Sequence, residues 1–119
     1  MLLAVAGVFG VLSRWALAKF ISWPDGFPYA TLLINLLGSL AIGIVWALAL
    51  SRRIPREWVS ILCVGFLGGF TTFSAFSLES VLLWENRQFT AAAAYVVLAP
   101  IFGVLLAFAG MRLGQWVWP

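Results

Sequence analysis

Four long apolar segments, separated by short polar links, constrain this chain more than any other feature. They cover approximately Leu2–Ile21, Tyr29–Leu50, Val59–Trp84 and Phe89–Met111. A helix of about 20 apolar residues crosses the hydrocarbon core of a bilayer. Because only 9% of the 119 residues are charged and 64% are hydrophobic, a soluble fold of this size could not bury the apolar surface. We therefore predict an all-α, multi-pass protein of the cell membrane, with one four-helix transmembrane domain over residues 1–119.

The composition argues against several other classes of protein. The net charge of +3 comes from seven basic residues, mostly near segment ends, so we expect no nucleic-acid partner. The chain has no histidine, and Cys63 is its only cysteine, so neither a structural zinc site nor an intrachain disulfide is expected. The sequence contains no evident nucleophile–base pair or metal cluster, and we predict that the protein is not an enzyme.

The third segment contains a stretch that is poorly suited to a continuous helix. This stretch, Gly65–Ser77, reads GFLGGFTTFSAFS. Gly68 and Gly69 each cost about 1 kcal/mol relative to alanine in a helix, and Thr71 and Thr72 are β-branched. A membrane helix is interrupted only where protein or a water-filled cavity satisfies the freed backbone groups. We therefore predict a broken third helix with an ion or substrate site beside it.

Polar residues inside the other segments point to the same kind of site. Thr31, Asn35 and Ser39 are spaced by four, so they share one face of the second helix and favour a pathway over a single bond between helices. Glu79 lies within the apolar run of the third segment, where a carboxylate is either functional or paired with an arginine. Arg14 lies inside the first segment and should face protein or water, unless it is interfacial.

Basic residues are distributed almost evenly between the two sides of the membrane. Four spans place both termini on one side, with Arg52, Arg53, Arg56 and Arg112. The other side carries Lys19 and Arg87, and Arg14 if it is counted. Either the chain inserts one way, with the termini in the cytoplasm, or it inserts both ways. Because four helices are too few to enclose a path in their own centre, we expect a homo-oligomer, and two opposed copies would form an antiparallel dimer.

The motif from Gly65 to Ser77, followed by Glu79, closely resembles the signature of the Fluc (CrcB-type) fluoride channels. Arg14 after a glycine-rich start and the stretch Thr31–Ser39 resemble further motifs of that family, and the similarity covers essentially the whole chain. The resemblance implies a channel through which fluoride leaves the cytoplasm passively, which lowers fluoride toxicity. It also implies an antiparallel, dual-topology homodimer with two pathways.

The resemblance assigns roles to individual residues. Main-chain carbonyls of Gly68 and Thr71 would hold a structural Na⁺, and Arg14 would have a structural or electrostatic role. The implied fluoride pathway consists of Phe73, Phe76, Asn35, Thr31, Ser74, Ser77, Tyr95 and Glu79. Amide and hydroxyl groups are neutral donors, and phenyl rings have a weakly positive edge, which suits a small, strongly hydrated anion. The family often continues hydroxyls along the fourth helix, whereas this chain has Ala99 and Gly103 there.

Two other functions are compatible with four short spans. A small dual-topology multidrug transporter needs a carboxylate in its first span, where this chain has Arg14 and no acid. A non-transporting assembly subunit would use its glycines only to bind partner helices, and Gly7, Gly10, Gly65 and Gly69 have suitable spacings. In that case the phenylalanines after the glycines would be ordinary packing residues.

Overall fold

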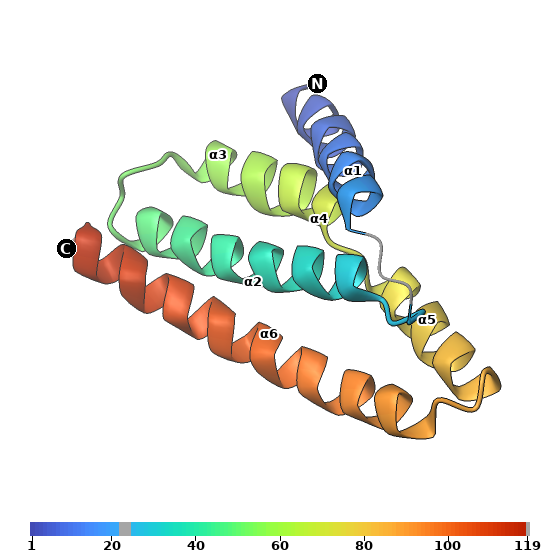
Figure 1. The fold of residues 1–119 in the computed structure, drawn as a ribbon. Helices are drawn as coiled ribbons and strands as arrows, with labels where there is room; N and C mark the ends of the chain where they lie inside the picture. The colour runs from blue at the N-terminus through green and yellow to red at the C-terminus, as the bar shows by residue number, and fades with distance from the viewer. Residues whose placement is uncertain (22–24, 119) are drawn as a thin grey trace.

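The computed structural model describes residues 1–21 and 25–118, and these residues are organised by helices (Figure 1). The elements are α1 (Leu2–Phe20), α2 (Tyr29–Leu50), α3 (Arg56–Ser60), the π-helix η1 (Ile61–Leu67), α4 (Gly68–Phe70), α5 (Phe73–Glu85) and α6 (Phe89–Val117). Four helical stretches are long and apolar enough to cross a membrane: Leu2–Phe20, Tyr29–Leu50, Arg56–Glu85 and Phe89–Val117. The predicted all-α architecture with four membrane-spanning segments is confirmed.

Glycines bring α2 and α6 into close contact, and the two helices lie side by side over most of their length (Figure 1). A Cβ atom on Gly43 of α2 would collide with the carbonyl oxygen of Ala107, and one on Gly110 of α6 would collide with that of Leu40. Small residues at such positions let two membrane helices approach backbone to backbone, where dispersion contacts hold them together. This helix pair forms one wall of the candidate site.

A second glycine interface joins α1 to η1 and α4. A Cβ atom on Gly65 would stand 2.8 Å from the carbonyl oxygen of Leu3, and one on Gly69 would stand 2.5 Å from that of Gly7. Gly10 of α1 faces the backbone of Phe66 in the same way. The close helix contact expected from the glycine spacing is therefore confirmed, with α1 as the partner.

Two residues without helical angles separate α4 from α5. Thr71 has φ −86° and ψ 160°, and Thr72 has φ −151° and ψ 117°. Both pairs of angles are extended, a conformation that β-branched residues adopt readily. The α5 helix then begins at Phe73 with Thr72 as its N-cap, because the Thr72 hydroxyl accepts a hydrogen bond from the Ala75 N–H at 3.2 Å.

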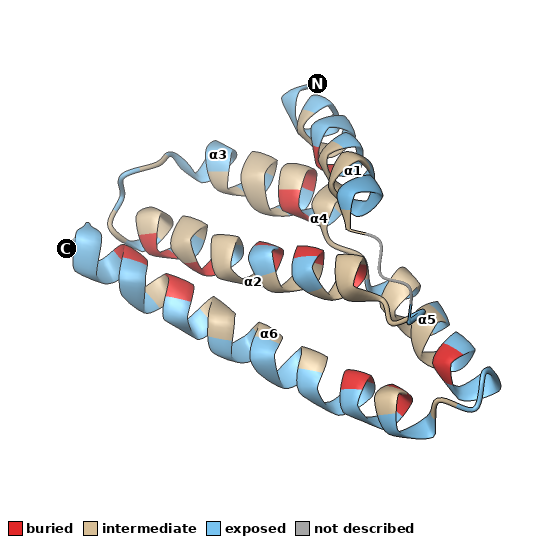
Figure 2. Cartoon of the chain, in the orientation of Figure 1, coloured by how far each residue is buried: buried red, intermediate tan, exposed pale blue. Residues whose placement is uncertain are grey.

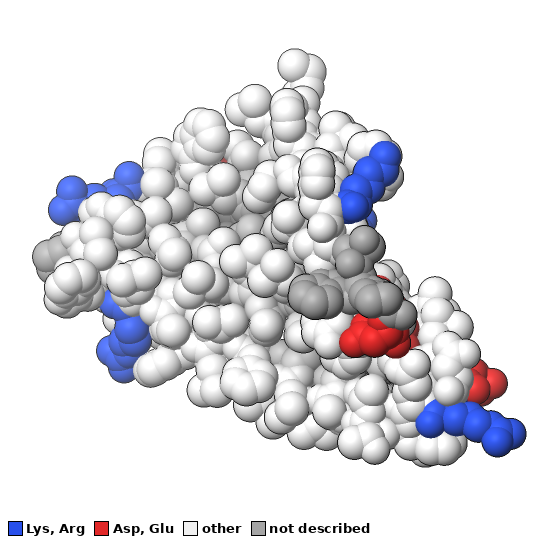
Figure 3. Space-filling model, in the orientation of Figure 1, with Lys and Arg blue, Asp and Glu red and all other residues white. Residues whose placement is uncertain are grey.

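Much of the molecular surface is apolar and open. Buried residues lie on the faces where helices meet, and exposed residues cover the rest (Figure 2). The chain exposes 7991 Å², well above the roughly 6,300 Å² expected for a compact soluble monomer of this mass. Lys, Arg, Asp and Glu side chains gather towards the ends of the molecule, and the space between them is uncharged in this view (Figure 3). This distribution suits a bilayer.

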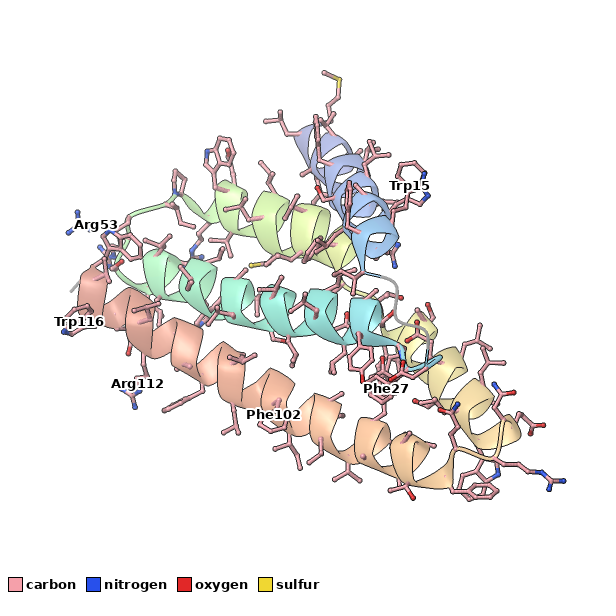
Figure 4. The ribbon with its side chains drawn as sticks, in the orientation of Figure 1. Trp15, Phe27, Arg53, Phe102, Arg112 and Trp116 are labelled. Atoms are coloured by element: carbon pink, nitrogen blue, oxygen red, sulfur yellow. The ribbon has the colours of Figure 1, made fainter. Side chains whose placement is uncertain are left out.

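Aromatic and basic side chains mark the ends of the spans. Arg53, Arg112 and Trp116 lie at the same end of the molecule, whereas Trp15 points outward from α1 (Figure 4). The Lys19 ammonium lies 3.6 Å from the centroid of the Trp15 ring. Helix α6, which is the fourth membrane span, continues to Val117, beyond the predicted end at Met111. The helix runs on through Pro100, and interfacial residues such as Arg112 do not stop a helix.

Candidate functional site

Asn35 binds the backbone of the extended segment between α4 and α5. Its Nδ2 donates to the Thr72 carbonyl at 3.0 Å, and the Thr72 N–H donates to its Oδ1 at 2.8 Å. A carboxamide carries a donor and an acceptor side by side, so it can pair both polar groups of one extended residue. In an apolar setting, leaving either group unpaired would be costly. Asn35 therefore stabilises the interruption of the helix.

The same interruption deprives two carbonyl groups of their usual helical donors. In a continuous α-helix, the N–H groups of Thr72 and Ala75 would donate to the carbonyls of Gly68 and Thr71. Here the Thr72 N–H donates to Asn35 and the Ala75 N–H donates to the Thr72 hydroxyl. The carbonyls of Gly68 and Thr71 are thereby left available, and both residues line a groove on the surface of the chain.

This groove has a volume of about 480 Å³ and runs between α2, η1, the start of α5 and α6. Its lining is mainly apolar, and none of the described residues along it is charged. The polar and sulfur-containing side chains that line it are Asn35, Ser39, Cys63, Thr71, Thr72 and Tyr95. The groove therefore combines neutral polar groups with a largely apolar wall.

Three aromatic rings follow one another along the groove. The centroids of Phe73 and Phe76 are 5.7 Å apart, and Phe76 meets Tyr95 edge to face at 4.9 Å and 61°. Tyr95 is buried, whereas 79% of Phe73 is exposed. In an edge-to-face pair, the weakly positive edge of one ring contacts the negative face of the other. Phe73 thus projects from the chain, and Phe76 connects it to the buried ring of Tyr95.

Glu79 of α5 joins three helices through two hydroxyl groups. The Thr31 hydroxyl donates to Glu79 Oε1 at 2.5 Å, and the Tyr95 hydroxyl donates to Oε2 at 3.0 Å. The partners of this carboxylate are hydroxyls from α2 and α6, and among the described residues no arginine pairs with it. A carboxyl group has two oxygens that can accept hydrogen bonds, so one side chain can pair with two hydroxyls. Because Tyr95 contacts both Glu79 and the ring of Phe76, this cluster lies next to Phe76.

Besides Thr31 and Glu79, three more of the predicted site residues lie apart from the groove lining, namely Ser74, Ser77 and Arg14. Ser74 is exposed, and its hydroxyl is 3.3 Å from that of Thr72. The Ser77 hydroxyl donates to the Phe73 carbonyl of its own helix at 3.0 Å. Arg14 is partly buried and follows Gly10 by four residues, which places it on the face of α1 that packs against η1 and α4. Its guanidinium makes no ion pair or hydrogen bond within residues 1–21 and 25–118.

Comparison with known proteins decides the family. The family model for CrcB-like proteins, described as Camphor Resistance (CrcB), matches residues 1–111 of the chain. This match includes the interrupted third span, the groove and the cluster around Glu79. The chain belongs to the CrcB-like protein family. The resemblance identified from the motifs of the sequence is therefore confirmed.

Relatives of this CrcB-like protein come from several bacteria. A protein of Stutzerimonas stutzeri is 45% identical over 115 residues, covering 94% of this chain and 93% of its own length. One of Thermus thermophilus is 40% identical over 116 residues, covering 96% of this chain and 91% of its own. One of Bacillus thuringiensis is 37% identical over 116 residues, covering 96% and 95%. All three are named fluoride-specific ion channels of the FluC type.

Phe27 of this CrcB-like protein was not among the site residues predicted from the sequence. Its ring lies 5.4 Å from that of Tyr95 and 4.6 Å from that of Tyr29, which extends the aromatic series to the start of α2 (Figure 4). Asp25 fixes this turn, because its carboxylate accepts hydrogen bonds from the Phe27 N–H and the Tyr29 hydroxyl, each at 3.1 Å. In the sequence, the pair Asp25-Gly26 is typical of a turn, and the aromatic residues on both sides of Pro28 could have indicated an aromatic contact at the start of α2. Trp23, an aromatic residue of the same link that the sequence alone suggests for the membrane interface, lies outside the described residues.

Proposed function

We propose that this protein is a passive fluoride channel that lets F⁻ leave the cytoplasm and lowers fluoride toxicity. The proposal rests on family membership, on relatives named as fluoride-specific channels, and on one observation in particular. That observation is an uncharged groove, beside a helix interruption, that combines amide and hydroxyl groups with the rings of Phe73 and Phe76. The function is transport without chemistry, so the protein is not an enzyme.

The groove offers fluoride the kind of coordination that permits both entry and exit. A conducted ion must exchange its hydration shell for ligands that bind it without trapping it. Asn35 uses one of its two Nδ2 hydrogens for Thr72 and retains the other for an anion. The positive edges of Phe73 and Phe76 add weaker attraction. A lysine in this position would hold the ion too tightly, and none lines the described groove.

The proposed channel is an antiparallel homodimer. A single chain leaves the groove open and 79% of Phe73 exposed, so a second copy is needed to close the route. The nearly even distribution of basic residues favours insertion in both orientations, which lets two opposed subunits meet. A two-fold axis between them would create two equivalent pathways, each lined by both subunits. In this assembly the interrupted third spans face each other at the centre.

The proposed dimer also includes a structural Na⁺ bound by main-chain oxygens of Gly68 and Thr71. Their carbonyls have lost their helical donors to Asn35 and Thr72, and unwound backbone of this kind coordinates Na⁺ in membrane proteins. Among the described residues, no group of three or more His, Cys, Asp or Glu could hold a metal instead. A bound cation would supply positive potential beside the anion route.

Thr31, Glu79 and Tyr95 are proposed to form one end of the pathway. Tyr95 lines the groove and bonds to Glu79, so the anion would reach this cluster after passing Phe76. Ser74 and Ser77 are proposed to line the route from the exposed side of α5 within the dimer, and Arg14 to act electrostatically from α1. Neither the multidrug transporter nor the assembly subunit gains support from these contacts.

Fluoride efflux from liposomes tests this function. Purified protein is reconstituted into vesicles loaded with potassium fluoride, and valinomycin is added to compensate charge while an electrode records released F⁻. We expect rapid, protein-dependent release. A rate equal to that of protein-free vesicles, from protein that elutes as a well-assembled dimer, would contradict the proposed function.

A further inference from the structure

The hydroxyl of Ser39 differs from the other hydroxyls that line the groove. Thr71 donates to the Leu67 carbonyl at 2.8 Å, and Tyr95 donates to Glu79 at 3.0 Å. The Thr72 oxygen caps α5 and lies beside that of Ser74. Within the described parts of the chain, Ser39 makes no hydrogen bond through its side chain.

This lack of a partner is unusual for a serine inside a helix. Serine hydroxyls commonly donate to the carbonyl one turn earlier, and Ser51, Ser77 and Ser80 all do so here, at 3.1, 3.0 and 2.7 Å. Ser39 instead lines the groove. Since it follows Asn35 by four residues, its hydroxyl continues the line of donors along the same face of α2.

The wall opposite Ser39 has space but no donor. The Ser39 oxygen lies 3.4 Å from the position that a Cβ atom on Gly103 would occupy, and Ala99 lies one turn earlier on α6. Ala99 and Gly103 both line the groove and carry no hydroxyl. A Cβ atom at position 103 would touch the Ser39 oxygen at ordinary van der Waals distance. The glycine leaves that space beside the hydroxyl to the groove.

We infer that Ser39 is a fluoride-binding residue of the pathway, and that it supplies from α2 the hydroxyl that α6 lacks at Ala99 and Gly103. The inference rests on the proposed function, because it names a further ligand for the same ion. A small anion leaving the free N–H of Asn35 would meet this hydroxyl next along the groove. A hydroxyl is a neutral donor, so it can bind and release fluoride without trapping it.

Moving the hydroxyl across the groove provides the test. Ser39→Ala removes one oxygen with little change in shape, and we expect fluoride efflux to fall by about ten-fold, the effect of losing one hydrogen bond to an ion. The double variant Ser39→Ala with Gly103→Ser places a hydroxyl on the opposite wall, in the space that the serine oxygen vacated. We expect it to recover most of the lost rate. Ser80→Ala, which removes a hydroxyl bonded to its own helix, is the matched control and should conduct normally.

The outcomes separate this inference from the proposed function. If the unaltered protein releases no fluoride, the proposed function itself fails. If the unaltered protein conducts and Ser39→Ala conducts equally well, the Ser39 inference is wrong and the channel function stands. A well-assembled double variant that stays as slow as Ser39→Ala would also overturn the inference. Stabilisation by added fluoride, measured by thermal unfolding in detergent, gives a second readout: Ser39→Ala should lose part of it and the double variant should regain it.

Discussion

Asn35 and Thr72 exchange two hydrogen bonds, at 3.0 and 2.8 Å, across 37 positions of sequence. The pairing ties α2 to the point where the third span leaves its helical angles. It also leaves one Nδ2 hydrogen of Asn35 for another acceptor. In the proposed channel, one side chain therefore stabilises the interruption and serves the ion.

The double role of Asn35 predicts a loss of both stability and flux in Asn35→Leu. The Thr72 N–H and carbonyl would be left without partners, and each such group costs about 1–3 kcal/mol. We expect the protein to unfold at lower temperature in detergent and to release fluoride more slowly from liposomes. Asn86→Leu, at an exposed position in the link before α6, is the control and should change neither. Unaltered stability of Asn35→Leu would show that the pairing with Thr72 does not support the fold.

A cation site at Gly68 and Thr71 predicts that the protein depends on sodium. If their carbonyls bind Na⁺, replacing it by a large organic cation should destabilise the dimer and slow fluoride release. Gel filtration and efflux are measured in matched sodium and N-methyl-D-glucamine buffers of equal ionic strength. Indifference of both measurements to the replacement would remove the sodium site from the account.

Dual topology predicts that C-terminal reporters give signal from both sides of the membrane. The count of basic residues, four against two when Arg14 is left out, provides little bias. Combining Gln115→Lys with Arg87→Gly should shift insertion towards one orientation, and glycine suits the positive φ of 61° at position 87. Strongly one-sided signal from the unaltered protein would exclude dual topology and would leave a dimer possible.

The helices of this fold were largely predictable from local sequence. Predicted and observed bounds coincide for α2, Tyr29–Leu50, because Pro28 precedes it and the polar link with Arg52 and Arg53 follows. The end of α6 was predicted too early, because a basic residue at the interface looks like the end of a span when only hydropathy is considered. The close contact of α1 with η1 and α4 was predictable from the spacing of Gly65 and Gly69.

The contacts of the candidate site could not be predicted in the same way. Glu79 was expected to be either functional or paired with an arginine, and its partners among the described residues are, instead of an arginine, the hydroxyls of Thr31 and Tyr95, 48 and 16 positions away. Whether it is functional stays a prediction. The partner of Asn35 depends on where the extended segment falls against α2. Such pairings are set by tertiary packing, and hydropathy and spacing carry no information about them.

The central claim is that the rings of Phe73 and Phe76 line the route of fluoride. If they only pack, Phe→Ile keeps most of the apolar volume, costs about 1–3 kcal/mol and leaves transport intact. If they line the route, an aliphatic side chain lacks the positive ring edge that meets the anion. Phe102→Ile changes a half-exposed ring on α6 that points away from α2 (Figure 4) and is the matched control.

The most direct measurement is fluoride efflux from liposomes carrying Phe73→Ile, Phe76→Ile or Phe102→Ile, each checked by gel filtration for dimer assembly. We predict that release collapses in the first two variants while their dimers elute normally, and that Phe102→Ile releases fluoride like the unaltered protein. Full release from well-assembled Phe73→Ile and Phe76→Ile variants would contradict the account and assign both rings to packing alone.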